Sequence, residues 1–393
     1  MTIFVQKHFR LLVTGGGTGG HTYPALTTVR ALTARLGVSG ITTEVVWAGN
    51  PDGLEATVAA SEGIAFRPVA TGKVRRASSP LGMLTARNAA DMVQAANGVV
   101  QARSVVRDFR PDVVLSTGGY AAVPIGLAAR QLRRPLVVHE QTVRLGLANR
   151  VLVRGATAIA ISESSTMDLL PPHVRARTVV TGNPIRPELF CGDAARATVA
   201  LDLSTFDPDK PVVYVTGGAQ GAVQINRLVS ACLPTLLEHA NVIHQCGPNN
   251  TEAMAEQIVE LPGHLAARYR VVGFVTDALP DVLALADLVV SRSGAGTLAE
   301  LTALGKPAVL IPLASSAGNE QLHNAHRLRD LGAAVVLDGD ITSMQLEAAI
   351  TALLTNPDQR LAMASAARAH GRPDAAHHLV DVLLQAAGTG IPS

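Results

Sequence analysis

The chain has 393 residues, which is too many for one ordinary hydrophobic core, so two domains are expected. Apolar residues make up 48% of the sequence and charged residues 16%, a composition that is typical of well-packed globular proteins and excludes a disordered or fibrous chain. Lys plus Arg (33) nearly balance Asp plus Glu (31), and aromatic residues are 3%. The sequence therefore lacks the basic surface and stacking residues of a nucleic-acid-binding protein, and no nucleic acid partner is expected.

Cysteine usage and hydropathy indicate the cellular compartment in which the protein is expected to work. Cys191, Cys232 and Cys246 are far apart and form no C-x-x-C pair, which argues against a disulfide framework and a zinc site. The N-terminal segment leads into LLVTGGG without the apolar region and cleavage site of a signal peptide. No apolar run approaches the roughly 20 residues that span a bilayer. We expect a cytoplasmic protein whose membrane contact is peripheral.

Short apolar runs alternate with Ala-rich helical stretches through the first half of the chain. Buried parallel strands read as continuous apolar runs of this kind, and their alternation with helices predicts a doubly wound sheet. The predicted strands are 10–14, 43–49, 112–118, 135–140, 158–162 and 178–182.

The same cycle restarts after Asn183 and Pro184. LLVTGGGTGGH (11–21) and VVYVTGGAQGA (212–222) both read as strand, glycine turn and helix start. The predicted strands of this half are 212–218, 241–247, 269–274, 287–294, 307–312 and 333–338. We expect an α/β fold of two Rossmann-like domains, residues 1–185 and 186–369, whose parallel sheets face a central cleft, with a C-terminal helix (370–388) packing back on the first domain.

A glycine-rich turn follows the first predicted strand. Gly15, Gly17 and Gly20 satisfy G-x-G-x-x-G, a pattern that presents backbone N–H groups and a helix N-terminus to phosphate. A dinucleotide site also needs an acid at the end of the next strand, which ends WAGN without one, so nicotinamide binding is disfavoured. Pro24 is predicted in the first helical turn, where its missing donor costs nothing. His21 either bonds its own loop at the helix start or is a functional group in the cleft.

Eight ordered motifs carry a resemblance to a known family. The sequence resembles the MurG family of glycosyltransferases, within glycosyltransferase family 28, over nearly its whole length. That family transfers GlcNAc from UDP-GlcNAc to the MurNAc 4-hydroxyl of undecaprenyl-diphosphate-MurNAc-pentapeptide, converting lipid I into lipid II. The resemblance implies a GT-B fold and an inverting reaction that needs no metal or other cofactor. The motifs are GGGTGGHTYPAL (15–26), STGGYAAVP (116–124), HEQTVRLGLANR (139–150), TGNPIR (181–186), TGGAQGAVQIN (216–226), HQCG (244–247), SRSGAGTLAELTALGKPAVLIP (291–312) and NEQLHNA (319–325).

The resemblance also implies a donor site on the second domain. Phe274 and Val275 would meet the uracil, and Glu300 would accept hydrogen bonds from the ribose hydroxyls. Gln321 and Asn324 would recognise the sugar, although their i, i+3 spacing equally suits a solvated helix face. An exposed helical position is the alternative for Glu300, but its place after a glycine turn favours the cleft. The predicted donor-binding residues are Arg186, Ala219, Gln220, Phe274, Val275, Ser293, Gly294, Ala295, Thr297, Glu300, Gln321 and Asn324.

An inverting transfer needs a base for the acceptor hydroxyl and charge stabilisation for the departing UDP. His21 is the candidate base, with His139 and Glu140 lining the same cleft. His139 is equally consistent with a buried structural histidine, because it ends an apolar strand. By resemblance, backbone amides of the glycine-rich turn would bind the acceptor's diphosphate. The predicted acceptor-binding residues are Gly17, Thr18, Gly19, Gly20, Tyr120, Thr142 and Asn149.

A polyprenyl-diphosphate acceptor implies contact with the inner face of the cell membrane. Segment 71–89 mixes basic and apolar residues in a way that suits an anionic bilayer surface, although a loop followed by an ordinary amphipathic helix gives the same letters. The basic and apolar residues of segment 71–89 are Lys73, Arg75, Arg76, Arg87, Leu81, Met83 and Leu84.

Two acidic segments are interpreted as turns. The acids of DPD (207–209) and DGD (338–340) are expected to be turn residues and not metal ligands.

Three positions depart from the pattern of the family. Thr142 stands where Asn is usual, Ala219 stands where Ser is usual, and Glu320 adds a negative charge near the predicted sugar site. A MurG-like paralogue that glycosylates a natural product or another acceptor with a related UDP-hexosamine would accommodate these changes. Two further classes fit the two-domain pattern: a UDP-sugar 2-epimerase of the same architecture, and a non-catalytic UDP-sugar-binding or membrane-recruiting subunit.

Overall fold

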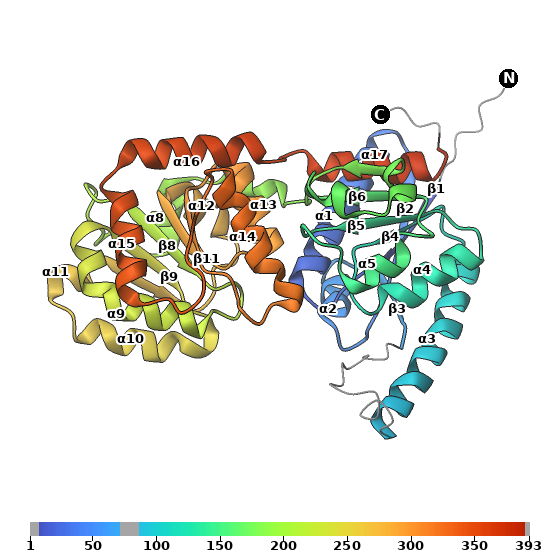
Figure 1. Cartoon of the computed structure of the whole chain (residues 1–393), viewed down its shortest axis with the longest axis horizontal. Helices are drawn as coiled ribbons and strands as arrows, with labels where there is room; N and C mark the ends of the chain where they lie inside the picture. Colours follow the sequence, from blue (N-terminus) through green and yellow to red (C-terminus); the bar gives the residue numbers. More distant parts are fainter. Residues whose placement is uncertain (1–7, 71–85, 390–393) are drawn as a thin grey trace. The chain divides into compact units, whose positions relative to one another are not determined.

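The computed structural model describes residues 8–70 and 86–389, without the side chains of 86–96 and 317. The chain divides into two compact units, Met1–Ile185 with Pro373–Ser393 (unit 1) and Arg186–Arg372 (unit 2). In each unit a parallel sheet lies between layers of helices (Figure 1).

The sheet of unit 1 has the order β3-β2-β1-β4-β5-β6-β7, and every pair in it is parallel. Its strands are β1 (His8–Thr14), β2 (Thr42–Gly49), β3 (Ala65–Pro68), β4 (Val113–Ser116), β5 (Leu136–Glu140), β6 (Ala158–Ile161) and β7 (Thr178–Val180).

The sheet of unit 2 is also parallel throughout, with the order β10-β9-β8-β11-β12-β13. Its strands are β8 (Val212–Thr216), β9 (Asn241–Gln245), β10 (Tyr269–Val272), β11 (Leu288–Ser291), β12 (Ala308–Leu310) and β13 (Val335–Val336).

Helices cover both faces of each sheet. Unit 1 contains α1 (Gly19–Val38), α2 (Leu54–Ser61), α3 (Ala86–Phe109), α4 (Ala122–Gln131), α5 (Leu147–Leu152), α6 (Thr166–Leu169), α7 (Pro172–Arg175) and α17 (Ala375–Ala386). Unit 2 contains α8 (Ala194–Ala200), α9 (Val223–His239), α10 (Thr251–Val259), α11 (Gly263–Ala266), α12 (Leu279–Leu285), α13 (Ala295–Leu304), α14 (Glu320–Asp330), α15 (Ser343–Leu354) and α16 (Pro357–His370), with the short 3₁₀ turns η2 (Pro187–Cys191), η3 (Pro248–Asn250) and η4 (Ala317–Asn319).

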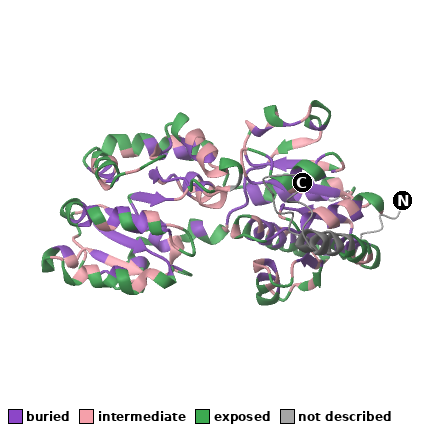
Figure 2. Ribbon diagram, turned by 60° about the horizontal axis from the view of Figure 1, so that its bottom comes forward, coloured by how far each residue is buried: buried purple, intermediate pink, exposed green. Residues whose placement is uncertain are grey.

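The apolar runs of the central strands are explained by burial on both faces. Along β1, Phe9, Leu11 and Val13 join one hydrophobic core, while Leu12 joins the core on the opposite face with Val46 of β2. Successive side chains of a strand point to opposite faces, so a strand covered by helices on both sides needs apolar residues throughout. Figure 2 shows the central strands of both sheets coloured mainly as buried.

Each strand order reverses at one point, between β1 and β4 in unit 1 and between β8 and β11 in unit 2. In open parallel sheets, ligands bind outside the carboxyl ends of the strands at this reversal. The glycine-rich turns after β1 and β8 therefore lie where the topology favours a ligand.

One strand was not predicted, and one local expectation was wrong. Strand β3 was not predicted, because Ala65–Pro68 is a short, largely exposed edge strand with a charged residue and no continuous apolar run. Pro24 is not in the first turn of its helix: α1 begins at Gly19 and Pro24 lies inside it. The missing N–H of Pro24 leaves the carbonyl of Gly20 without its helical partner.

The C-terminal helix α17 packs against α1 in unit 1. Leu379, Val380 and Leu383 are fully buried in the core that includes Leu11 of β1. Burial of this apolar face, at roughly 25 cal/mol per Å², holds α17 against the first sheet.

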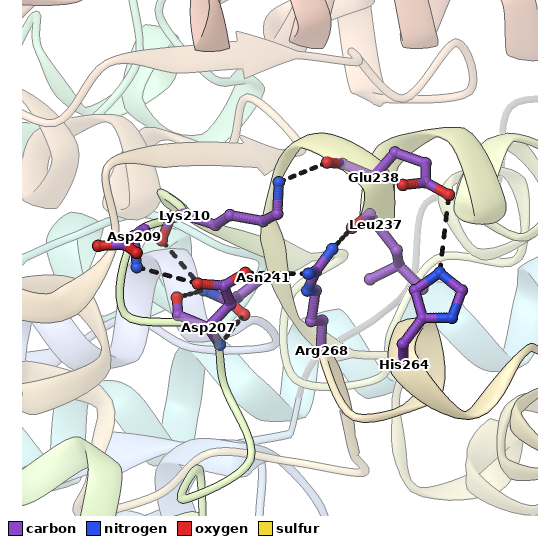
Figure 3. Close-up of polar contacts among 8 residues, drawn as sticks. All are labelled: Asp207, Asp209, Lys210, Leu237, Glu238, Asn241, His264 and Arg268. Carbon is purple, nitrogen blue, oxygen red and sulfur yellow. Dashed lines mark hydrogen bonds and ion pairs between the residues drawn. The ribbon is translucent and has the colours of Figure 1, made fainter.

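The acidic turn 207–209 precedes β8 and is held by an ion pair and by hydrogen bonds (Figure 3). Asp207 forms an ion pair of 2.9 Å with Arg268, and its other carboxylate oxygen accepts a hydrogen bond from the backbone N–H of Asp209. The side chain of Asn241, at the start of β9, donates to the carbonyls of Asp207 and Lys210. These contacts tie the turn to β9.

The segment predicted to meet a membrane falls mainly on residues 71–85, which lie outside the described residues. In the ranges 8–70 and 86–389, no helix combines the length and the apolar character that crossing a bilayer requires.

Candidate functional site

The glycine-rich turn of unit 1 is held by close packing of main chain and side chains. Gly15 has φ 149°, and a Cβ there would lie 1.9 Å from Oγ1 of Thr117. The indole of the buried Trp47 donates a hydrogen bond of 3.1 Å to the carbonyl of Gly15. A Cβ on Gly119 would lie 2.6 Å from the carbonyl oxygen of Gly16. Only glycine allows the turns after β1 and β4 to approach this closely.

His21 lies in the first turn of α1 and belongs to a hydrogen-bonded chain that crosses unit 1. Its Nδ1 is 2.9 Å from Oε1 of Gln141. Nε2 of Gln141 is 3.1 Å from both Nδ1 and the carbonyl oxygen of His139. Nε2 of His139 is 3.0 Å from the carbonyl oxygen of Gly182. The chain thus joins the helix after β1 to the ends of β5 and β7.

The two carbonyl groups determine the direction of every bond in this chain. A carbonyl can only accept, so Nε2 of His139 donates to Gly182 and the NH₂ group of Gln141 faces the carbonyl of His139. Nδ1 of His139 is then an acceptor, and Oε1 of Gln141 accepts from Nδ1–H of His21. In its neutral form His21 therefore keeps a lone pair on Nε2, which has no hydrogen-bond partner within residues 8–70 and 86–389.

Of the two interpretations of His139, the structure fits the buried structural histidine and not a residue that lines a cleft. Its side chain is 0% exposed, and both ring nitrogens are hydrogen-bonded. Burial lowers the pKa of His139 to about 4, against a smaller opposing effect of the hydrogen bond to Gly182. The ring stays neutral near pH 7 and acts as a fixed link between Gly182 and Gln141.

Glu140 is also enclosed, with 2% exposure. Oε1 accepts hydrogen bonds from the backbone N–H and the hydroxyl of Thr142, and Oε2 accepts from the backbone N–H of Gly146 and from Nδ2 of Asn149. Three N–H donors, and the Thr142 hydroxyl that Glu140 shares with the carbonyl of Arg144, make this carboxylate the anchor of loop 141–149.

Thr142 and Asn149 were expected to contact an acceptor, and their observed contacts are internal. Both donate to Glu140, and Asn149 also donates to the carbonyl of His139. Oδ1 of Asn149 is buried and has no hydrogen-bond partner in the described part of the chain. Tyr120, by contrast, is 58% exposed on the turn after β4.

The amide of Gly17 is not free for a ligand as expected. Its N–H donates a hydrogen bond of 2.9 Å to Oε2 of Glu55, a buried residue in the first turn of α2. Thr18 and Gly20 are exposed, and the first residues of α1 have no intrahelical acceptor for their N–H groups. These outer amides remain open to an anion.

Unit 2 contains a pocket of about 460 Å³ at the carboxyl ends of β8 and β11. Of the predicted donor-binding residues, Gly294, Thr297 and Gln321 line it, while Ala219, Gln220 and Ala295 do not. The remaining lining comes from Thr216, Gly217, Gly218, Gly221, Ala222, Val223, Gln224, Ser291, Arg292 and Leu313.

Arg292 was missed by the sequence analysis although it stands between two predicted site residues. Its Nη1 donates to Oε1 of Gln224 at 2.9 Å and to the carbonyls of Ile311 and Pro312. Burial lowers its pKa from the usual value, but a guanidinium remains charged in proteins. Arg292 thus places a positive charge in the lining of the pocket.

Ser293 and Asn324 join the turn before α13 to helix α14. The fully buried Ser293 donates a hydrogen bond of 2.7 Å to the carbonyl of Gln321, and Nδ2 of Asn324 is 3.3 Å from the carbonyl of Ser293. Ser293 was expected to bind a ligand, but its hydroxyl is committed to this link. Oε1 of Gln321 accepts from the N–H of Leu313.

Glu300 and Arg186 form a second group in unit 2. Their side chains make an ion pair of 3.3 Å and are both partly exposed. Burial raises the pKa of Glu300, and the Arg186 guanidinium opposes this effect. The carboxylate is therefore held near a cation in a poorly solvated position, where it favours additional hydrogen-bond donors.

Phe274 and Val275 follow β10 and differ in what they expose. The Phe274 ring is 49% exposed, whereas Val275 is buried and its N–H donates a hydrogen bond of 2.9 Å to Oε1 of Gln245. Nε2 of Gln245 donates to Oγ1 of Thr216, which lines the pocket. Gln245 thus links the backbone at Val275 to Thr216 in the lining of the pocket.

Among residues 8–70 and 86–389, no three His, Cys, Asp or Glu side chains gather into a group that could hold a metal ion.

Two parallel doubly wound sheets, each with a glycine-rich turn at its switch point, define the GT-B class of fold. The family model of the glycosyltransferase family 28 N-terminal domain matches residues 11–161, and that of the C-terminal domain matches residues 212–379. A protein from Lachnospira eligens, named UDP-N-acetylglucosamine--N-acetylmuramyl-(pentapeptide) pyrophosphoryl-undecaprenol N-acetylglucosamine transferase, is 35% identical over 352 residues, which are 89% of this chain and 92% of that protein. The chain belongs to glycosyltransferase family 28.

Solved structures agree on the architecture. The crystal structure of Acinetobacter baumannii MurG is similar with a TM-score of 0.72 and 27% identity, over 96% of this chain and 99% of that one. A UDP-GlcNAc 2-epimerase from Neisseria meningitidis has a TM-score of 0.65 with 15% identity, over 96% of this chain and 99% of that one. The likeness to the epimerase shows the fold alone.

Proposed function

We propose that this protein transfers GlcNAc from UDP-GlcNAc to the 4-hydroxyl of MurNAc in undecaprenyl-diphosphate-MurNAc-pentapeptide, the conversion of lipid I into lipid II in peptidoglycan synthesis. Membership of family 28 supports the transferase class, and the names of its relatives support this donor and acceptor. The observation that carries the proposal is the hydrogen-bonded chain from Gly182 to His21, which leaves a lone pair on Nε2 of the neutral His21 ring.

In the proposed reaction, the acceptor hydroxyl attacks the anomeric carbon of GlcNAc from the face opposite UDP. The new C–O bond forms as the bond to UDP breaks, and the electron pair leaves on the β-phosphate oxygen. Nε2 of His21 takes the proton of the hydroxyl. His139, Gln141 and Glu140 act as positioning residues, because their polar atoms are used within the protein.

The donor is proposed to bind unit 2. The uracil packs on the exposed ring of Phe274 and not on the N–H of Val275, which Gln245 already holds. Glu300 accepts hydrogen bonds from the ribose hydroxyls, and Arg186 turns from Glu300 toward the nucleotide. The sugar contacts Gln321, which lines the pocket.

The charge of the departing UDP is proposed to be met by protein groups, with no metal ion or other cofactor. Gly294 and Thr297 lie at the start of α13, whose N-terminal amides favour a diphosphate. The guanidinium groups of Arg186 and Arg292 supply positive charge on the same unit.

The acceptor is proposed to bind unit 1 through the outer amides at Thr18–Gly20, with Tyr120 beside them. Its polyprenyl chain places the reaction at the cytoplasmic face of the cell membrane, and segment 71–89, with its basic and apolar residues, is proposed to contact the anionic lipid surface.

The test is incubation of the purified protein with UDP-GlcNAc and a soluble lipid I analogue, followed by mass spectrometry of the product, with and without EDTA. We expect one added GlcNAc, release of UDP only when the acceptor is present, and no effect of EDTA. UDP release without acceptor would favour an epimerase, and tight UDP binding without transfer would favour a paralogue with another acceptor. Loss of transfer in EDTA that added metal restores would contradict the metal-free mechanism.

A further inference from the structure

The glycine-rich turn of unit 1 contains an anion that belongs to the protein. The side chain of Glu55, 1% exposed, reaches from α2 into the turn after β1. Its Oε2 accepts the N–H of Gly17 at 2.9 Å, and its Oε1 accepts the N–H of Asn50 at 3.1 Å. In Rossmann-like folds, main-chain amides of this turn are the groups that a ligand's phosphate uses.

The space around this carboxylate exists because three neighbours are glycines. A Cβ would lie 2.1 Å from Cδ of Glu55 if built on Gly16, 2.3 Å from Oε2 if built on Gly53, and 2.8 Å from Cγ if built on Gly49. Gly16 lies in the turn after β1, Gly49 ends β2, and Gly53 lies in the turn that follows β2. The two turns together form a cradle with the dimensions of one carboxylate.

The charge of Glu55 is balanced by main-chain dipoles. Within residues 8–70 and 86–389, no Lys, Arg or His makes an ion pair with it. A buried carboxylate is costly unless it accepts hydrogen bonds, and here two amides and the N-terminus of α2 supply the compensation. The same groups would balance the charge of a phosphate.

We propose that Glu55 is a built-in anion that fills the inner anion position of the glycine-rich turn, orders the turn before any ligand binds, and closes that position to phosphate groups. One consequence rests on the proposed function: the diphosphate of the acceptor is confined to the outer amides at Thr18–Gly20, beside His21. Glu55 is then a positioning residue for the acceptor.

The first test needs no enzymatic activity. Glu55→Ala removes the carboxylate and leaves two amides facing a cavity that formate fits. Its melting temperature should lie below that of the unsubstituted protein and rise by several degrees in sodium formate, but not in sodium chloride at the same concentration. Glu62→Ala, which removes an acid paired with Arg30 at the end of α2, is the control and should show no formate-specific rise.

Absence of a formate-specific rise in Glu55→Ala, or an equal rise in Glu62→Ala, would overturn the proposal. If Glu55→Ala does not fold, Glu55→Gln serves instead. Its NH₂ group would face a backbone N–H, so it should be less stable than the unsubstituted protein although its shape is the same. A Gln variant of unchanged stability would contradict the built-in anion.

The second test measures kinetics. In Glu55→Ala we expect the KM for the lipid I analogue to rise roughly tenfold or more, as for the loss of a charged hydrogen-bond acceptor from two amides, with partial recovery in formate. The KM for UDP-GlcNAc should not change. Equal changes in both KM values would overturn the positioning role. Formate-specific stabilisation without any transfer by the unsubstituted protein would refute the proposed function and leave the built-in anion supported.

Discussion

Oε1 of Gln141 accepts a hydrogen bond of 2.9 Å from Nδ1 of His21. The orientation of the Gln141 amide follows from its NH₂ group, which faces the carbonyl of His139. The protein thereby selects one tautomer of the neutral His21 ring without placing a charge beside it. A carboxylate in the place of Gln141 would have favoured the imidazolium form, which cannot accept a proton.

Gln141→Glu tests this choice of a neutral partner. The added carboxylate should favour protonated His21, so the acid limb of the pH profile of kcat/KM should move to higher pH, and the rate at pH 7 should fall. The profile is measured from pH 5.5 to 9. Gln385→Glu, on the exposed side of α17, is the matched control and should leave the profile unchanged. An unmoved acid limb in Gln141→Glu would show that His21 does not control it.

Acid should destabilise the fold through His139. The folded-state pKa is lowered by burial from 6.5 to about 4, so the unfolded chain binds one more proton between these values. Stability is therefore fully present above pH 6.5 and falls as the pH decreases toward 4, by up to about 3 kcal/mol for this residue. The free energy of unfolding, measured with urea at several pH values, should fall less steeply in His139→Gln.

His244 in unit 2 has the same lowered pKa, about 4, for the same reason, so His139→Gln should remove only part of the slope. His173→Gln, an exposed substitution on α7, is the control and should keep the full slope. Identical slopes in His139→Gln and the unsubstituted protein would contradict the buried neutral ring.

Glu300→Gln should weaken UDP binding about 10- to 100-fold in calorimetry at pH 7.5, because a neutral amide accepts ribose hydroxyls less strongly than a carboxylate. Burial raises the pKa of Glu300, so its charge is lost at a higher pH than that of an ordinary glutamate, and the advantage over the Gln variant should shrink as the pH falls. The ratio of the two dissociation constants cancels the protonation of UDP itself. Glu252→Gln, exposed on α10, is the control, and a constant ratio from pH 7.5 to 5 would contradict the role of the carboxylate.

The central strands of the two sheets could be predicted because each of them is covered on both faces. Burial on both faces demands continuous apolar runs, as in Leu11, Leu12 and Val13, and such runs are visible in one sequence. The edge strand β3 carries no such demand, and its exposed residues give no signal. The start of α1 was predicted too late, because the sequence alone does not distinguish a proline inside a helix from one in its first turn.

The candidate site was predictable only in part. The motif HEQT placed polar residues at the end of β5, but burial of Glu140 depends on donors from loop 141–149, which local spacing does not reveal. Glu55 gave no signal at all, because its partner Gly17 is 38 positions away. Arg292 lies within the motif SRSGAG, but the glycines beside it favoured main-chain contacts to a ligand. Its side chain was therefore not predicted to line the pocket.

The most direct test of the central claim is the effect of His21→Ala on transfer and on donor binding in the same preparation. Transfer to the lipid I analogue should fall by about 10²- to 10⁴-fold, the usual contribution of a general base, while the dissociation constant of UDP stays unchanged. His173→Ala in the same unit should retain full activity. Full transfer by His21→Ala would contradict the account, because the hydrogen-bonded chain from Gly182 would then end at a residue that takes no part in the reaction.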